Sequence, residues 1–161
     1  MIDIPKDIKD KICDFRTVAV PGSVFYCKNY KFPDNSQKNK YILILKSCDF
    51  NNNSVFFLPT SQLDKFQEIP YLLRQLYIFS EDKVPEFRKE TAICIRDLKR
   101  QPYHILERRF LANDNSIKLE YRFQIPKECL LEIYKRIKNS QDLSEFQKKC
   151  AIPEDIIDTL E

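Results

Sequence analysis

Three short runs of β-branched, aliphatic and aromatic residues follow one another between Val20 and Gln62. They are Ser23 to Lys28, Tyr41 to Lys46 and Ser54 to Leu58, and such residues suit a pleated sheet. The only glycine of the chain, Gly22, stands directly before the first run. Polar loops separate the runs, and the second loop, S-C-D-F-N-N-N, is short enough to close an antiparallel hairpin. This arrangement predicts a small, strongly bent antiparallel sheet.

The rest of the chain predicts helices before and after further strands. Ile4, Ile8 and Ile12 recur every four residues between charged residues, which is typical of a short amphipathic helix. The clearest helix lies at Lys127 to Asn139, because Pro126 stands at its start and apolar side chains follow at helical spacing. Further strands are expected at Leu76 to Ser80, Thr91 to Leu98 and Ile117 to Ile125. Further helical segments are expected as a helical or irregular excursion at 62–74 interrupted by Pro70, a short helix at Pro102 to Phe110, and short helices in the tail with Pro153 at a helix start.

We therefore expect one domain over residues 1–161, of the mainly β, α+β class. Within it, residues 1–16 form an N-terminal helix, residues 20–125 a small SH3-like antiparallel barrel, and residues 126–161 a C-terminal helical segment. A chain of 161 residues is long enough to bury a real core. Its 43% hydrophobic and 32% charged residues indicate a globular chain.

The residue types also argue against several kinds of site. His104 is the only histidine, and the six cysteines contain no C-x-x-C pair, so we expect no Cys/His metal site and no triad built on several histidines. A single glycine rules out the Gly-rich phosphate loops of nucleotide-binding folds, which need several. We expect reduced, mostly buried thiols, no bound metal and no cofactor.

The apolar runs are too short for a membrane span. The longest are Tyr41 to Leu45 and Val55 to Pro59, whereas a bilayer helix needs about 20 residues. The N-terminus lacks the basic and apolar regions of a signal peptide. We therefore expect a cytoplasmic protein without a membrane partner.

Local clusters of basic residues are more informative than the formal net charge of +3, which is too small to indicate a polyanionic partner. Two clusters contain few acids and are interleaved with tyrosine and phenylalanine. One holds Lys28, Lys31, Lys38 and Lys40, and the other holds Arg96, Lys99, Arg100, Arg108 and Arg109. Cations for phosphates and flat rings for bases are what single-stranded RNA requires of a surface. Composition alone is equally compatible with a solvated lysine-rich loop and an ordinary basic helix face.

The stretch V-P-G-S-V-F-Y-C, K-N-K-Y-I-L-I-L and V-F-F-L-P-T-S-Q resembles the MazF/PemK family of toxin endoribonucleases. In that family a first strand begins after Gly, a loop leads into a strand opened by a basic residue, and a third strand ends in Thr or Ser. The later T-A-I-C-I-R-D-L-K-R resembles the strand that precedes a small helix in the family. The helix at Lys127 to Asn139 corresponds to its C-terminal helix, so the resemblance covers residues 20–140.

The resemblance implies a metal-independent endoribonuclease that cleaves single-stranded RNA. It places Lys40 where the family has a catalytic arginine, and Thr60 or the neighbouring Ser61 where it has a catalytic hydroxyl. Lysine offers a single point charge in place of the planar fork of arginine. The surrounding cations expected to hold RNA are Lys28, Lys31, Lys38 and Arg96, and Lys38, Arg96 or His104 would supply further charge or proton transfer.

The same resemblance implies a toxin that a small acidic antitoxin neutralises, and a homodimer. The alternative is a non-catalytic SH3-like module that binds RNA or a protein partner, and a third hypothesis is a purely structural accessory protein. The lysine at position 40 is the sequence feature that divides the first two hypotheses.

Overall fold

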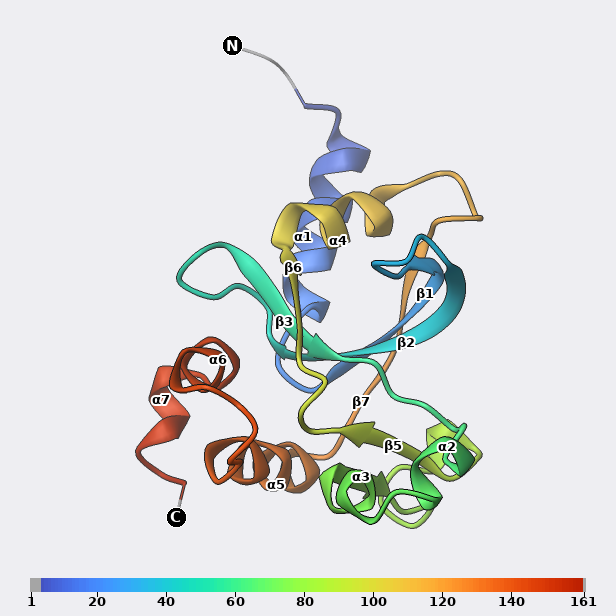
Figure 1. Cartoon of the computed structure of the whole chain (residues 1–161). Helices are drawn as coiled ribbons and strands as arrows, with labels where there is room; N and C mark the ends of the chain where they lie inside the picture. The colour runs from blue at the N-terminus through green and yellow to red at the C-terminus, as the bar shows by residue number, and fades with distance from the viewer. Residues whose placement is uncertain (1–3, 161) are drawn as a thin grey trace.

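The computed structural model describes residues 4–160, and for residues 8–13, 65 and 67 it describes the backbone only. Its largest element is a five-stranded antiparallel sheet in the order β6-β3-β2-β1-β7 (Figure 1). The strands are β1 (Ser23–Lys31), β2 (Gln37–Lys46), β3 (Asn53–Phe57), β6 (Lys99–Pro102) and β7 (Leu119–Gln124). The sheet separates two sets of helices, with α1 (Lys6–Val18) and α4 (Tyr103–Leu111) on one side and α5 (Lys127–Lys138) on the other.

Both faces of this sheet are buried. Ile42 and Ile44 face a core cluster with helices α1 and α4, whereas Leu43 and Leu45 face a second cluster with helix α5. Neighbouring side chains of a strand point to opposite faces. A strand covered on both sides must therefore be apolar at successive positions, which explains the uninterrupted Y-I-L-I-L run.

The N-terminal helix begins later than predicted. Its first residue is Lys6, after Pro5, and Ile4 precedes it with 44% of its surface exposed. The predicted apolar positions Ile8 and Ile12 lie outside the side chains that the structure describes. The buried anchor of the helix is Phe15, whose ring packs 5.1 Å from that of Phe110 in α4.

The first two strands extend further than the sequence predicted, and the loop between them is shorter. Tyr30 pairs with Lys38 and Lys31 with Gln37, so only residues 32–36 connect the strands. Two asparagines make this possible: Asn29, at φ 53°, lies at a shift of the pairing register, and Asn35, at φ 70°, lies in the turn. Asparagine tolerates this left-handed backbone better than other non-glycine residues.

A second, two-stranded sheet consists of β4 (Leu76–Phe79) and β5 (Thr91–Cys94). The excursion before it contains helices α2 (Asp64–Gln67) and α3 (Pro70–Gln75), and Pro70 begins α3 as its first residue. The short helix η1 (Pro85–Phe87) connects the two strands. The predicted strand at Thr91 to Leu98 is wrong in its last residues, because the chain turns after Cys94 and the N–H of Asp97 bonds to the Cys94 carbonyl.

The strand pairing leaves the five-stranded sheet open, with β6 and β7 at its edges. Among the described residues the structure therefore shows an antiparallel α+β fold and does not confirm the predicted barrel. Strand β6 was not predicted, because K-R-Q-P lacks the apolar residues of a strand and ends in proline. Its pairing with β3, Val55 opposite Arg100, determines its conformation, and an edge strand tolerates proline.

The C-terminal helices complete the core. Helix α5 begins at Lys127 as predicted and ends at Lys138, one residue before the predicted end, and the hydroxyl of its buried Tyr134 donates to the Leu45 carbonyl of β2. Helix α6 (Glu145–Ala151) begins with a capping box, in which the side chains of Ser144 and Gln147 each accept the backbone N–H of the other. Helix α7 (Glu154–Ile157) follows Pro153 as predicted. No helix among the described residues has the length and apolar character needed to cross a bilayer.

The cysteines are mostly buried thiols. Cys27, Cys94, Cys129 and Cys150 are free and buried, whereas Cys48 is free and exposed. Burial raises the pKa of the Cys27 thiol, and the nearby Arg109 guanidinium only partly opposes that shift. The expectation of buried thiols is therefore wrong at Cys48, and the side chain of Cys13 lies outside the described residues.

Candidate nucleic-acid interface

A groove of about 820 Å³ opens where β2 and β3 separate. Its walls come from the β1–β2 loop, the first half of β2, the segment that follows β3, and the chain around η1 and β5. These segments are far apart in the sequence and meet only in the folded chain. We call this hollow the groove.

The strands separate because the chain after β3 joins the other sheet. Leu43 pairs with Phe57, and the same register continued would set Lys40 opposite Thr60. Instead, Thr60 forms an isolated bridge with Ala92 of β5, with both N–H···O bonds 2.9 Å long. Lys40 instead pairs with Cys27 of β1, so Lys40 and Thr60 are not strand partners, although both line the groove.

Thr60 and Ser61 each bring a hydroxyl group to this groove. Thr60 is 9% exposed, and its Oγ1 accepts the backbone N–H of Gln62 at 3.1 Å. No described residue accepts a hydrogen bond from the Thr60 hydroxyl, so its proton remains available to a ligand. Ser61 is exposed beside it and also lines the groove. An alcohol can donate to a phosphoryl oxygen from either position.

The groove carries a local excess of positive charge. Its described lining includes five cationic side chains and two carboxylates: Lys38, Lys40, Arg88, Lys89 and Lys99 against Asp34 and Asp97. The hydroxyl and N–H of Ser36 both donate to Asp34 Oδ1, at 2.6 and 2.9 Å, and these bonds lower the pKa of Asp34. Asp34 therefore stays ionised, and the five cations still exceed the two carboxylates in the described lining of the groove.

Arg88 occupies a strained backbone position in the wall of the groove. Its φ is 61°, in the left-handed region, and it terminates η1. The other described non-glycine residues with positive φ are all asparagines, which adopt this conformation at lower cost. An exposed arginine held in this way is a candidate for function, because strain of this kind concentrates at binding sites.

Aromatic rings form part of the wall. Tyr26 and Tyr41 pack edge to face with centroids 5.4 Å apart, and Tyr41 packs in the same manner on Phe87 at 5.6 Å. All three line the groove. The two tyrosines are half-buried, and the Arg122 guanidinium lies over the Tyr26 ring, 5.0 Å from its centroid, so a cation and aromatic rings meet at this wall.

The structure brings together some of the predicted site residues and separates others. Lys38, Lys40, Thr60 and Ser61 all line the groove. Lys28 lies elsewhere and forms a 3.9 Å ion pair with Glu120, and the Arg96 guanidinium stacks over the Tyr71 ring at 5.6 Å. Lys31 lines a different pocket, and the exposed His104 of α4 is not among the described lining residues of the groove.

Sequence reasoning missed three cations of the groove as site residues. Arg88 and Lys89 follow η1, in a loop that was described only as charged, and Lys99 was noted only as part of the second basic cluster. The place of Arg88 and Lys89 depends on the Thr60–Ala92 bridge, which brings the β4–β5 sheet against the end of β3, whereas Lys99 is placed by its pairing with Phe56 of β3. No local sequence pattern predicts such a bridge.

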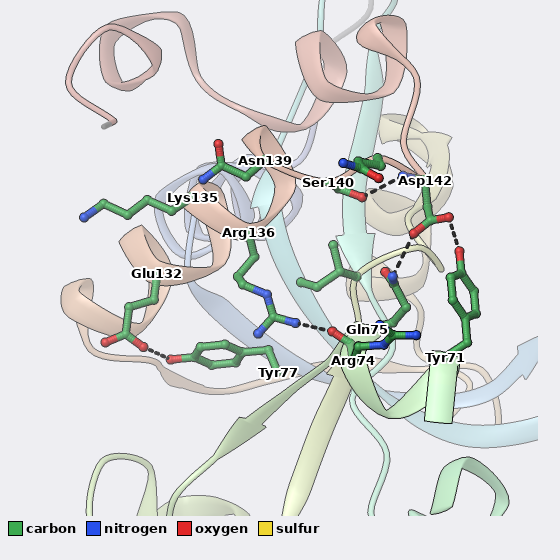
Figure 2. Close-up of a pocket in the computed structure, with 12 residues that line it drawn as sticks. Tyr71, Arg74, Gln75, Tyr77, Glu132, Lys135, Arg136, Asn139, Ser140 and Asp142 are labelled. Carbon is green, nitrogen blue, oxygen red and sulfur yellow. Dashed lines mark hydrogen bonds between the residues drawn. The ribbon is translucent and has the colours of Figure 1, made fainter. Parts of the chain in front are cut away.

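Another hollow, of about 640 Å³, lies between α3, β4 and α5 (Figure 2). Its carboxylates accept hydrogen bonds from tyrosines that also line the hollow. Asp142 accepts a hydrogen bond from the Tyr71 hydroxyl, and Glu132 accepts one from the Tyr77 hydroxyl at 2.6 Å. The second bond lowers the pKa of Glu132. Arg136 donates to a backbone carbonyl at the end of α3 at 2.9 Å. These bonds fasten α3 and β4 to the C-terminal helices, so we assign them a structural role.

No family model and no curated protein matches this chain. Within the part of the chain that the structure describes, no group of three or more histidine, cysteine, aspartate or glutamate residues could hold a metal ion. The chemistry of the groove itself is therefore the basis for a functional hypothesis.

Proposed function

We propose that the groove binds single-stranded RNA and that the chain cleaves it, as a MazF/PemK-like toxin of a toxin–antitoxin pair would. The observation that carries this proposal is the presence of Lys38, Lys40, Thr60 and Ser61 around one positively charged groove. In this proposal the two sheets, joined at Thr60 and Ala92, correspond to the strongly bent barrel expected from the sequence.

RNA carries its own nucleophile, so cleavage requires little from the protein. The ribose 2′-OH loses its proton and attacks the adjacent phosphorus, the bond to the 5′ oxygen breaks, and that oxygen takes up a proton. The products are a 2′,3′-cyclic phosphate and a 5′-hydroxyl end. The protein has to align the groups and stabilise the charge that develops on the phosphoryl oxygens.

We assign Lys40 and Thr60 to the stabilisation of the charge that develops on the phosphoryl oxygens. The Lys40 ammonium would interact with one phosphoryl oxygen as a point charge, and the Thr60 hydroxyl, or that of Ser61, would donate a hydrogen bond to another. Lys38, Arg88 and Lys89 would hold the flanking phosphates. A small acidic antitoxin would suit the same positively charged groove, and the homodimer remains part of the proposal.

The second candidate function is a non-catalytic module that binds RNA or a protein partner. The observation that favours it is Lys40 itself, since lysine replaces the arginine fork at the position that would contact the scissile phosphate. Such a module would use the same groove and the same cations without breaking a bond.

The test incubates the purified protein with a long single-stranded RNA in EDTA and analyses the fragment ends. Cleavage that leaves cyclic phosphate ends and requires Lys40 supports the endoribonuclease. The matched control is Lys127→Ala, because Lys127 is an exposed lysine of α5 outside the described lining of the groove.

Binding is measured in parallel by fluorescence anisotropy over a range of salt concentrations. Each lost phosphate contact should reduce the log–log salt slope by about 0.7, so Lys38→Ala with Lys40→Ala should reduce it by about 1.4. Intact RNA with this salt-dependent binding would identify the module. Affinity that depends neither on salt nor on the two lysines would rule out the groove as an RNA site.

A further inference from the structure

A pocket of about 530 Å³ adjoins the groove on the other side of the β1–β2 loop. Phe32, Pro33 and Lys99 line both hollows, so the two share one wall. The rest of this pocket comes from β1, β6 and α4, including Tyr30, Gln101 and others. We call it the side pocket.

Four cationic side chains line the side pocket, and its described lining contains no carboxylate. The four are Lys31, Lys99, Arg100 and Arg109. The two basic clusters of the sequence meet here, because Lys31 belongs to the first and the other three to the second. The fold thus concentrates positive charge that is dispersed along the chain.

Two of these cations are already engaged by the protein. Arg100 pairs with Asp49 at 2.7 Å, and Arg109 donates to the backbone carbonyls of Lys28 and Asn29 at 2.9 and 3.3 Å. No carboxylate of the described residues pairs with Lys31 or Lys99. These two ammonium groups therefore remain available to an anion, one at the mouth of the side pocket and one at its boundary with the groove.

The wall between the cations suits a nucleobase. The Tyr30 and Phe32 rings pack edge to face with centroids 5.0 Å apart, and the Tyr30 oxygen accepts a hydrogen bond from Gln101 Nε2 at 3.3 Å. That bond uses one of the two amide hydrogens of Gln101, so a hydrogen and the amide carbonyl remain for the edge of a base. Burial raises the pKa of Tyr30, so its hydroxyl stays protonated at neutral pH.

We propose that the side pocket is a further nucleotide subsite, which takes the nucleotide next to the dinucleotide whose phosphate lies at Lys40 and Thr60 in the groove. The RNA strand passes beside Phe32 and Pro33, its bridging phosphate lies between Lys31 and Lys99, and its base enters beside Gln101. This inference rests on the proposed RNA-binding function of the groove. It adds a position at which the Gln101 amide can distinguish one base from another.

The test measures the affinity of single-stranded RNAs of increasing length, from a dinucleotide upward, under conditions that prevent cleavage. Lys31→Ala removes a cation found in the side pocket and not in the described lining of the groove. It should leave the affinity for the dinucleotide unchanged. At low salt it should lower the affinity for longer RNA by about three- to tenfold, which is the size of one exposed charge contact.

Asn35→Asp provides a second variant at the mouth of the side pocket. Its backbone is at φ 70°, which aspartate also tolerates, and the added negative charge should repel the same phosphate. The matched control is again Lys127→Ala.

The possible failures can be distinguished. If RNA binds in a Lys40-dependent manner but neither variant changes the gain with length, the subsite is ruled out and the groove remains. If no RNA binds even to the unmodified protein, the proposed function fails and the subsite fails with it. If both variants weaken the dinucleotide and the longer RNA equally, Lys31 acts on the groove itself and the subsite is ruled out.

Discussion

Arg100 donates from both Nε and Nη2 to one oxygen of the buried Asp49 carboxylate, at 3.0 and 2.7 Å. The other oxygen accepts the backbone N–H groups of Asn51 and Asn53, at 2.8 and 3.0 Å. The carboxylate thus joins edge strand β6 to the turn between β2 and β3. Both of its oxygens are satisfied, which is what a buried charge requires.

Replacement of Asp49 should be costly. Asp49→Ala leaves the Arg100 guanidinium unpaired and two N–H groups of the turn without their acceptor, so we expect a loss of about 3 kcal/mol in the free energy of unfolding. Lys83→Ala is the control, because its ion pair with Glu132 is exposed and is worth less than about 1 kcal/mol. Urea denaturation of both variants measures the difference, and equal losses would contradict this account.

The same carboxylate predicts how stability depends on pH. Burial alone would raise the pKa of Asp49, but the N–H groups of Asn53 and Asn51 and the Arg100 guanidinium outweigh it, so the pKa is lowered. Its contribution is therefore fully present above the unfolded value of about 3.9 and is lost as pH falls through the folded pKa. Asp49→Asn cannot ionise, so its stability should fall less steeply below about pH 4 than that of the unmodified chain. Parallel curves from denaturation at several pH values would refute the assignment.

Arg88→Gly should have opposite effects on stability and on binding. Glycine adopts φ 61° without a Cβ penalty, so we expect the free energy of unfolding to rise by about 0.5–1 kcal/mol. The same change removes a cation from the groove and should weaken RNA binding. Lys89→Ala is the control: it removes the neighbouring cation, and its stability should stay within about 0.5 kcal/mol. A destabilised Arg88→Gly would show that this backbone is not strained.

The catalytic hypothesis predicts steep losses of rate for two single changes. Lys40→Ala and Thr60→Val should each slow RNA cleavage by about 10²–10³-fold, the usual effect of removing one group that stabilises developing charge. Lys40→Arg should retain or raise the rate, because its fork can hold two phosphoryl oxygens. Single-turnover cleavage rates, with circular dichroism to confirm folding, decide the matter. If Ser61→Ala loses the rate and Thr60→Val does not, the catalytic hydroxyl belongs to Ser61.

The strands and helices whose own residues show an apolar pattern could be predicted from the sequence. Helix α5 follows from Pro126 and one apolar face, and β2 follows from its continuous apolar run. Strand β6 could not be predicted, because its pairing with β3 and not its residues makes it a strand. The apolar run of β2 is compatible with burial on both faces, but it does not indicate which helices cover each face.

The candidate site was predictable only in part, for a similar reason. Lys40 and Thr60 were assigned to one site by the family resemblance, and both line the groove. Arg88 and Lys99 come from distant segments: the position of Arg88 depends on how the two sheets meet, and that of Lys99 on the pairing of β6 with β3. Lys28 and Arg96 were grouped with the site by charge alone, which does not determine the direction of a side chain.

The pairing of Thr60 with Ala92 also determines how the groove can recognise a ligand. The backbone of Thr60 is held by two hydrogen bonds, and its β-branched side chain has a single, restricted χ1 torsion. Its hydroxyl therefore loses almost no conformational entropy when a ligand binds. The exposed Lys38 has a long, freely rotating side chain, and ordering such a chain costs up to about 2 kcal/mol. In the proposed complex the rigid alcohol would set the position of a phosphate, while the mobile ammonium group would attract it without demanding one geometry.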